Sequence, residues 1–161
     1  MIQATILSVL DYGDIVYMHA AHSSLKPLDA VYHSALRFIT GDAFTTHHCR
    51  LYEKIGWPSL AKRREQHCIL FIYKALLKLL PDYLNCLLEP KEGHYHTRSQ
   101  DFFTLEIPTV NSELGKTAFR FYGPHMWNSL QSVLKLKILI SFDRFKSMVM
   151  NTMISNCNCT L

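Results

Sequence analysis

Apolar residues recur at intervals of three and four along two long segments, and this spacing constrains the fold more than any other feature of the sequence. The first segment covers residues 28–39 and is followed by Gly41, a residue type that commonly ends helices. The second covers residues 60–80, begins after Pro58-Ser59 and is closed by Pro81. Both predict amphipathic helices. Their apolar positions are Leu28, Val31, Ala35, Leu36 and Ile39, and then Cys68, Ile69, Ile72, Tyr73, Leu76, Leu77 and Leu80.

Shorter helices are predicted around these two. Thr45-Thr46 could cap a helix that ends before Gly56, residues 82–88 have the length of two turns, and Ser141 could cap a helix over residues 142–149. At the start of the chain the apolar residues fall on one helical face with no capping residue ahead of them, so we expect a helix that is cut at this end. These residues are Ile2, Ile6, Val9 and Leu10.

A change of period in the C-terminal half predicts a β-hairpin. Phe103, Leu105 and Ile107 alternate with polar residues, and Phe119 and Phe121 alternate again, which is the two-residue period of a strand. Residues 108–116 would connect the two strands.

After the second strand, Gly123-Pro124 would end the extended segment and begin a short helix that carries Trp127 and Leu130. We expect Trp127 to anchor a core, so that Trp127→Ala would destabilise the fold by roughly 3 to 5 kcal/mol.

Together these elements predict a mainly α fold with a small antiparallel β-hairpin in the C-terminal half and a helical, bundle-like N-terminal half. Residues 89–101 are rich in Gly, His and charge without any periodicity, which indicates a surface loop. We expect a helical region over residues 1–88, the loop over 89–101, a small α+β region over 102–150 and a disordered tail over 151–161.

Composition limits the classes of function. A chain of 161 residues with 48% hydrophobic residues can bury a core. Its net charge of +4 divides into −2 over residues 1–42 and +6 over the remainder. A mildly basic C-terminal part is compatible with phosphate contacts, but it falls short of the strong basic stripe of a dedicated nucleic-acid-binding protein.

Cysteine usage and hydropathy indicate the compartment. Five cysteines at irregular spacing, and a start without a basic and apolar leader pattern, predict a reduced, intracellular protein, either cytoplasmic or nuclear. The longest apolar block, residues 68–73, ends at Lys74 and is far shorter than the ~20 residues that cross a bilayer. We therefore expect no membrane association.

Four segments carry a family resemblance. Taken in order, they resemble the region that follows the polymerase thumb at the C-terminal end of reverse transcriptase polyproteins from non-LTR (LINE-type) retrotransposons. The likeness spans residues 6–148. The segments are Leu10-Asp11-Tyr12-Gly13-Asp14-Ile15-Val16-Tyr17, Ser34-Ala35-Leu36-Arg37-Phe38-Ile39-Thr40, Gly56-Trp57-Pro58-Ser59-Leu60, and residues 112–130 with their Trp127-Asn128 pair.

The resemblance implies RNA-templated DNA synthesis only where the palm, fingers and endonuclease are present. The family's catalytic Tyr-x-Asp-Asp turn is expected upstream of this chain, and no adjacent Asp pair occurs in it. We therefore expect a non-catalytic fragment that is not an enzyme, with no catalytic residue and no cofactor. Its remaining roles would be docking on the missing polymerase body or touching RNA or DNA. The alternative is a small helical protein-interaction module, or a translated relic, with no nucleic-acid role.

Asp11 and Asp14 are the closely spaced carboxylates near an apolar segment, and they have two interpretations. Paired carboxylates can hold Mg²⁺ in a two-metal site. Asp residues that flank Tyr12-Gly13 are also typical of a turn, where their side chains bond local backbone amides. The turn is the favoured interpretation.

No other metal or catalytic site is predicted. His47, His48 and Cys49, with His67 and Cys68, are the densest potential ligands. Adjacent residues on a helix point in different directions, however, and the paired spacing of a structural zinc site is missing. The sequence also lacks a phosphate-binding glycine loop and a nucleophile elbow.

Candidate nucleic-acid contacts are basic residues. Three of them lie in the first turns of the 60–80 helix, although a helix N-terminus favours anions by ~0.3 to 1 kcal/mol per charge. Tyr95, Phe102 and Tyr122 could stack on bases. Self-association through the cut first helix is also expected. The basic candidates are Lys62, Arg63, Arg64, Arg98, Lys116 and Arg120.

Overall fold

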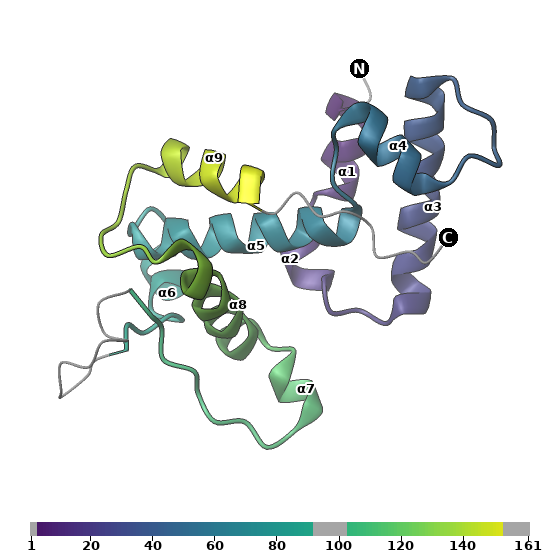
Figure 1. The fold of residues 1–161 in the computed structure, drawn as a ribbon. Helices are drawn as coiled ribbons and strands as arrows, with labels where there is room; N and C mark the ends of the chain where they lie inside the picture. The colour runs from purple at the N-terminus through teal and green to yellow at the C-terminus, as the bar shows by residue number, and fades with distance from the viewer. Residues whose placement is uncertain (1–2, 92–102, 153–161) are drawn as a thin grey trace. The chain divides into compact units, whose positions relative to one another are not determined.

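The computed structural model describes residues 3–91 and 103–152, and these residues are mainly helical (Figure 1), which confirms the predicted fold class at that level. Most of the loop predicted over 89–101, most of the tail predicted over 151–161 and the aromatic candidates Tyr95 and Phe102 lie outside the described residues. The elements are η1 (Gln3–Leu7, a π-helix), α1 (Ser8–Leu10), α2 (Asp14–Tyr17), α3 (His22–Thr40), α4 (His48–Ile55), α5 (Leu60–Leu76), α6 (Asp82–Asn85), α7 (Glu113–Lys116), α8 (Phe119–Leu134) and α9 (Phe142–Thr152).

The chain divides into two compact units. Unit 1 is Met1–His67 with Met150–Leu161, and unit 2 is Cys68–Val149. The boundary falls inside α5 and near the end of α9. Within the described residues, no helix has the length and apolar character needed to cross a membrane.

Unit 1 is built around the predicted amphipathic helix α3. This helix ends at Gly41, as predicted, because Gly41 takes the left-handed conformation (φ 67°) and its N–H donates to the Arg37 carbonyl at 2.8 Å. Gly56 ends α4 in the same way, with φ 70°. The buried core of the unit consists of Leu7, Leu10, Tyr32, Leu36, Leu51 and Leu60, with Ile6, Leu28, Tyr52, Ile55 and Trp57 packed against it.

The predicted apolar face of the first helix is only partly correct. Leu10 is buried and Ile6 packs on the core, but Val9 is 73% exposed and Leu7 lies inside instead. The segment starts as a π-helix, whose i→i+5 hydrogen bonds put more residues in each turn than the α-helical pattern assumes. Ile2 lies outside the described residues.

Several helix boundaries differ from the prediction. Helix α5 ends at Leu76 rather than near Leu80, and Lys78 has a positive φ of 56°, which no α-helix continues. Helix α6 is one turn long and stops at Asn85. Helix α4 is capped by His47 rather than by Thr45 or Thr46, because the His47 side chain accepts from the Cys49 N–H.

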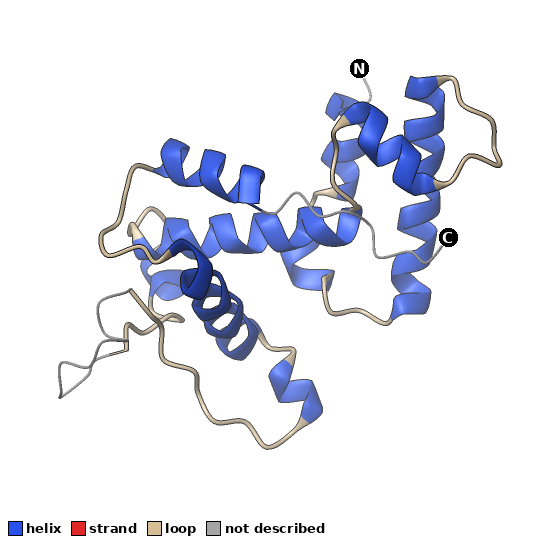
Figure 2. Ribbon diagram, in the orientation of Figure 1, coloured by secondary structure: helices blue, strands red, loops and turns tan. Residues whose placement is uncertain are grey.

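The predicted β-hairpin is wrong. Within residues 3–91 and 103–152 there is no strand (Figure 2), and the one pairing of this kind is an isolated antiparallel bridge between Pro90 and Leu105. Phe119–Tyr122 form the first turn of α8, and the helix continues through Gly123 and Pro124, where a break was predicted. The buried residues of α8 show the helical spacing: Gly123, Pro124, Trp127, Leu130 and Gln131.

Side chains of α8 supply the hydrogen bonds that a partner strand would have supplied to the extended segment 103–105. Trp127 Nε1–H donates to the Phe103 carbonyl at 2.8 Å. Asn128 Oδ1 accepts from the Leu105 N–H and its Nδ2 donates to the Leu105 carbonyl, both at 2.8 Å. Gln131 Nε2 donates to the Phe103 carbonyl at 3.0 Å. The segment is therefore extended without belonging to a sheet.

Trp127 is a core anchor of unit 2, as predicted. It is fully buried, and its ring lies 6.0 Å from that of Tyr73 and 5.8 Å from that of Phe145. Tyr73 and Phe145 stack at 3.7 Å with an angle of 12° between the rings. The Tyr73 hydroxyl donates to the Ile140 carbonyl and accepts from the Ile140 N–H, at 2.6 and 2.7 Å. This clamp fixes the segment that leads into α9.

Candidate functional site

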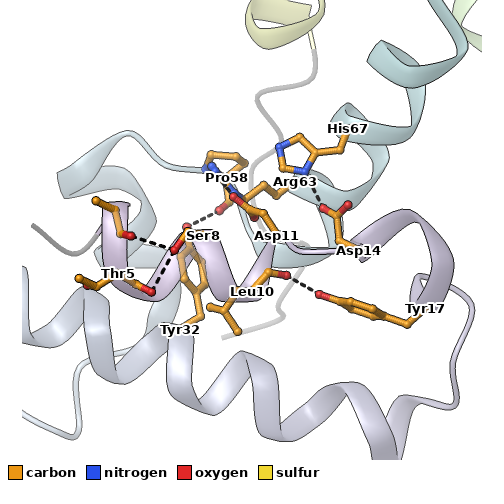
Figure 3. A network of polar contacts seen from close by, with 11 residues as sticks. Thr5, Ser8, Leu10, Asp11, Asp14, Tyr17, Tyr32, Pro58, Arg63 and His67 are labelled. Carbon is orange, nitrogen blue, oxygen red and sulfur yellow. Dashed lines mark hydrogen bonds and ion pairs between the residues drawn. The ribbon is translucent and has the colours of Figure 1, made fainter. Parts of the chain in front are cut away.

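The carboxylates of Asp11 and Asp14 point toward α5, and each is held by a basic side chain of that helix (Figure 3). Arg63 donates to Asp11 through both Nε and a terminal nitrogen, at 2.7 and 2.6 Å. His67 Nδ1 lies 2.5 Å from Asp14 Oδ2. Gly13, with φ 66°, makes the turn between α1 and α2 that brings the two carboxylates to the same side. Asp14 is only 4% exposed.

Arg63 and its neighbour Lys62 each pair with a carboxylate, which accounts for cations in the first turns of α5 although a helix N-terminus disfavours them. The bidentate hydrogen bond that Arg63 donates to Asp11 raises the pKa of Arg63 above its usual value, against the opposing effect of burial. Lys62 pairs with Glu65 at 2.9 Å. The carboxylates of Asp11 and Glu65 thus offset the unfavourable interaction between these cations and the helix N-terminus.

Tyr17 closes the network on the other side. Its hydroxyl donates to the Leu10 carbonyl, across the turn that contains both aspartates. Burial raises the pKa of Tyr17, and the negative charges of Asp14 and Asp11 raise it further, while Arg64 lowers it. The turn is thus tied down by its flanking residues as well as by α5.

This arrangement bears on the two interpretations of Asp11 and Asp14. Single donor atoms of Asp11, Asp14 and His67 do lie within 4.8 Å of one another, the spacing of a possible cation site. Both Asp11 oxygens, however, already accept from the Arg63 guanidinium, which a cation would have to displace. The turn is formed as predicted, but the aspartate side chains bond α5 rather than local backbone amides.

The basic candidates for nucleic-acid contact are divided between the two units. Lys62, Arg63 and Arg64 belong to unit 1, and Arg64 is buried. Lys116 and Arg120 belong to unit 2, where Lys116 pairs with Glu113 at 2.5 Å and Arg120 with Glu89 at 3.1 Å. Arg98 lies outside the described residues. Tyr122, the described member of the stacking candidates, is half-buried in α8.

A hollow of about 120 Å³ is lined by the Glu89–Arg120 pair together with Leu87, Glu106 and Pro108. Small-molecule sites are typically larger, roughly 300 to 1,000 Å³. The hollow is therefore too small for a substrate of that size.

A second group of functional side chains lies at the start of α4. Single donor atoms of His47, His48 and Cys49 come within 4.8 Å of one another. The sequence pattern predicts all three on a helix, where adjacent side chains diverge. His47 instead has the extended conformation of an N-cap (φ −65°, ψ 139°), so its side chain does not follow the helical direction. A cap signal from a histidine is weak in sequence, which is why the convergence was missed.

No protein-family model, curated protein or solved structure matches this chain.

Proposed function

We propose that this chain is a non-catalytic region of a retrotransposon-derived reverse transcriptase that docks on the polymerase body through an apolar face. The observation that carries the proposal is the role of Asp11 and Asp14. Both lie in the segment that carries the resemblance, and both are engaged by side chains of α5. Two carboxylates that are engaged in this way have a structural role in the fold.

Other residues that carry the resemblance also have structural roles. Gly56 ends α4, and Ser59 Oγ accepts from the Lys62 N–H at the start of α5. Trp127 and Asn128 hold the extended segment 103–105 by hydrogen bonds. The motifs therefore contain the turns, caps and side-chain clamps that determine the fold, which supports a folded accessory region.

The proposed docking face consists of exposed apolar side chains of α1, α2 and the turn between them. Tyr12 and Val16 are 86% and 89% exposed, and Val9 precedes them at the spacing of about one helical turn. Large apolar side chains exposed close together are typical of protein–protein contact surfaces. We take the polymerase body as the partner because the resemblance places this segment directly after the thumb. An intracellular location, cytoplasmic or nuclear, is part of this proposal.

Self-association of the purified chain tests the docking face, because an apolar face without its partner pairs with a second copy. We expect the mass from light scattering to rise with concentration, and the Tyr12→Ser/Val16→Ser variant to stay monomeric. Val133→Ser/Ile138→Ser is the matched control, since both residues are exposed but lie in unit 2. A wild type that is monomeric at every concentration, or a control that loses association equally, would contradict the proposal.

Nucleic-acid contact is the second candidate function, and exposure favours Lys116 and Arg120 as its residues. Their side chains are 49% and 61% exposed, and exposed ion pairs are worth only ~0 to 1 kcal/mol, so phosphates could replace Glu113 and Glu89. RNA and DNA binding measured at two salt concentrations tests this candidate. Affinity that falls as salt rises, and falls less steeply in Lys116→Gln/Arg120→Gln, would support it. Affinity independent of salt would exclude phosphate contact.

A further inference from the structure

Three consecutive residues at the start of α4 present nitrogen and sulfur donors toward one point. His47, His48 and Cys49 each offer one donor atom, and the three atoms lie within 4.8 Å of one another. The imidazole rings of His47 and His48 lie 4.1 Å apart. All three residues are half-buried, so a small ion can reach them from solvent.

The His48 ring is held in place by a neighbour from α3. The His33 ring stacks on it at 4.9 Å with an angle of 13° between the planes. His33 Nε2 in turn lies 2.5 Å from the Tyr52 hydroxyl, one turn further along α4. A donor whose orientation is fixed by packing loses little freedom when it binds an ion.

We propose that His47, His48 and Cys49 bind a zinc ion, with a water molecule or an external donor in the fourth position. Nitrogen and thiolate donors select borderline transition ions and disfavour Mg²⁺ and Ca²⁺, which take oxygen ligands. Zn–N bonds of about 2.0 Å and Zn–S bonds of about 2.3 Å put two nitrogens and one sulfur roughly 3.3 to 3.5 Å apart in a tetrahedral site. Rotation of the His47 and Cys49 side chains brings the donors from their spacing here to that distance.

Charge balance follows from the binding step. The Cys49 thiol loses its proton to solvent as the sulfur–zinc bond forms, and no electron is transferred. The resulting thiolate lies in the first turn of α4, where the helix N-terminus favours an anion. Arg37 donates to the carbonyl of Thr46, the residue before His47, and its positive charge opposes the ion, so we expect Arg37→Gln to bind zinc more tightly than the wild type.

Zinc titration of the full chain, by calorimetry against a competing chelator, tests the proposal. The titration is made in a Cys157→Ser/Cys159→Ser background, because that pair is a competing thiol source in the sequence. We expect one zinc per chain. Cys49→Ser and His48→Gln should each weaken binding by about 10- to 100-fold or more, the loss seen when even a supporting residue of a metal site is removed. Cys86→Ser, which changes an exposed cysteine of unit 2, is the matched control and should bind as the background does.

Cobalt substitution keeps the test independent of variant folding. Cobalt bound to the background protein should show a thiolate-to-cobalt charge-transfer band and the visible absorption of tetrahedral coordination. Far-UV circular dichroism of each zinc-free variant checks that its helices are retained. Absence of saturable zinc binding in the background, absence of the charge-transfer band, or binding unchanged in both Cys49→Ser and His48→Gln would overturn the proposal.

Discussion

Replacing Asn128 with alanine removes the side chain that stands in for a partner strand. Asn128 makes both a donor and an acceptor hydrogen bond to the backbone of Leu105, each at 2.8 Å, and Leu105 is fully buried. In Asn128→Ala both Leu105 backbone groups lose these partners. A buried polar group left unpaired costs about 1 to 3 kcal/mol, so the two together lower the free energy of unfolding by roughly 2 to 6 kcal/mol.

Urea denaturation followed by Trp127 fluorescence measures this loss. The measurement is made in a Trp57→Phe background, because Trp57 belongs to unit 1 and Trp127 to unit 2, so that the signal reports unit 2 alone. Ser129→Ala is the matched control, since Ser129 is exposed on the same helix and bonds only the His125 carbonyl. We expect its effect to stay within about 0.5 kcal/mol. An Asn128→Ala value as small as the control value would refute the reasoning.

Three further predictions concern unit 1. A double-mutant cycle with Asp11→Ala and Arg63→Ala should give a coupling free energy of about 1 to 2 kcal/mol, because the pair is bidentate and three-quarters buried, and a coupling near zero would show that the pair does not stabilise the fold. Burial raises the pKa of Tyr32 to about 12 while its unfolded value is near 10, so its contribution to stability is full below about pH 10 and is lost as pH rises toward 12. Absorbance titration should therefore show one fewer late-ionising tyrosine in Tyr32→Phe than in the wild type, and a variant titration identical to the wild type would contradict this assignment. Gly41→Ala should cost about 1 to 2 kcal/mol in urea denaturation through backbone strain alone, since φ is 67° and a Cβ there meets no atom within 4 Å, and a neutral variant would disprove the left-handed cap.

The long helices could be predicted because their signals are local. In α3 the apolar spacing and the glycine that follows it act within about four residues of each other, and both the helix and its end at Gly41 are found. In α8 the local signal misleads. Phe119 to Tyr122 alternate over only four residues, too few to separate a two-residue period from a helical one, and Gly123-Pro124 normally ends an element. Packing of Trp127, which lies further along α8, determines that these residues are helical.

In the extended segment 103–105 the local pattern predicts the backbone conformation but not the groups that pair with it. Its alternation holds only in part, since Leu105 is buried and Glu106 is exposed, but Ile107, on the predicted apolar face, is 39% exposed. Its hydrogen-bond partners, however, include the side chains of Trp127 and Asn128, more than 20 residues away, as well as the backbone of Lys91 and Leu136. A period of two therefore predicts an extended backbone correctly but does not identify what pairs with it.

The candidate site could be predicted only in part. The sequence points to Asp11 and Asp14, to the turn between them and to the cations of α5 as a group in an unfavourable position. It gives no signal that Arg63 pairs with Asp11 and His67 with Asp14, because 52 and 53 residues separate the partners. Such pairs are set by tertiary packing, which no local spacing encodes.

The unfolding free energy of Asp14→Ala, measured with and without Mg²⁺, tests the central claim most directly. If Asp14 serves the fold through His67, the variant loses about 1.5 to 3 kcal/mol, the value of a hydrogen bond to a charged group, and Mg²⁺ leaves the wild-type stability unchanged. If the carboxylates instead form a metal site, Mg²⁺ stabilises the wild type by mass action, and removing a repelling carboxylate leaves the metal-depleted variant as stable as the wild type or more so. That second result would contradict a structural role for the pair.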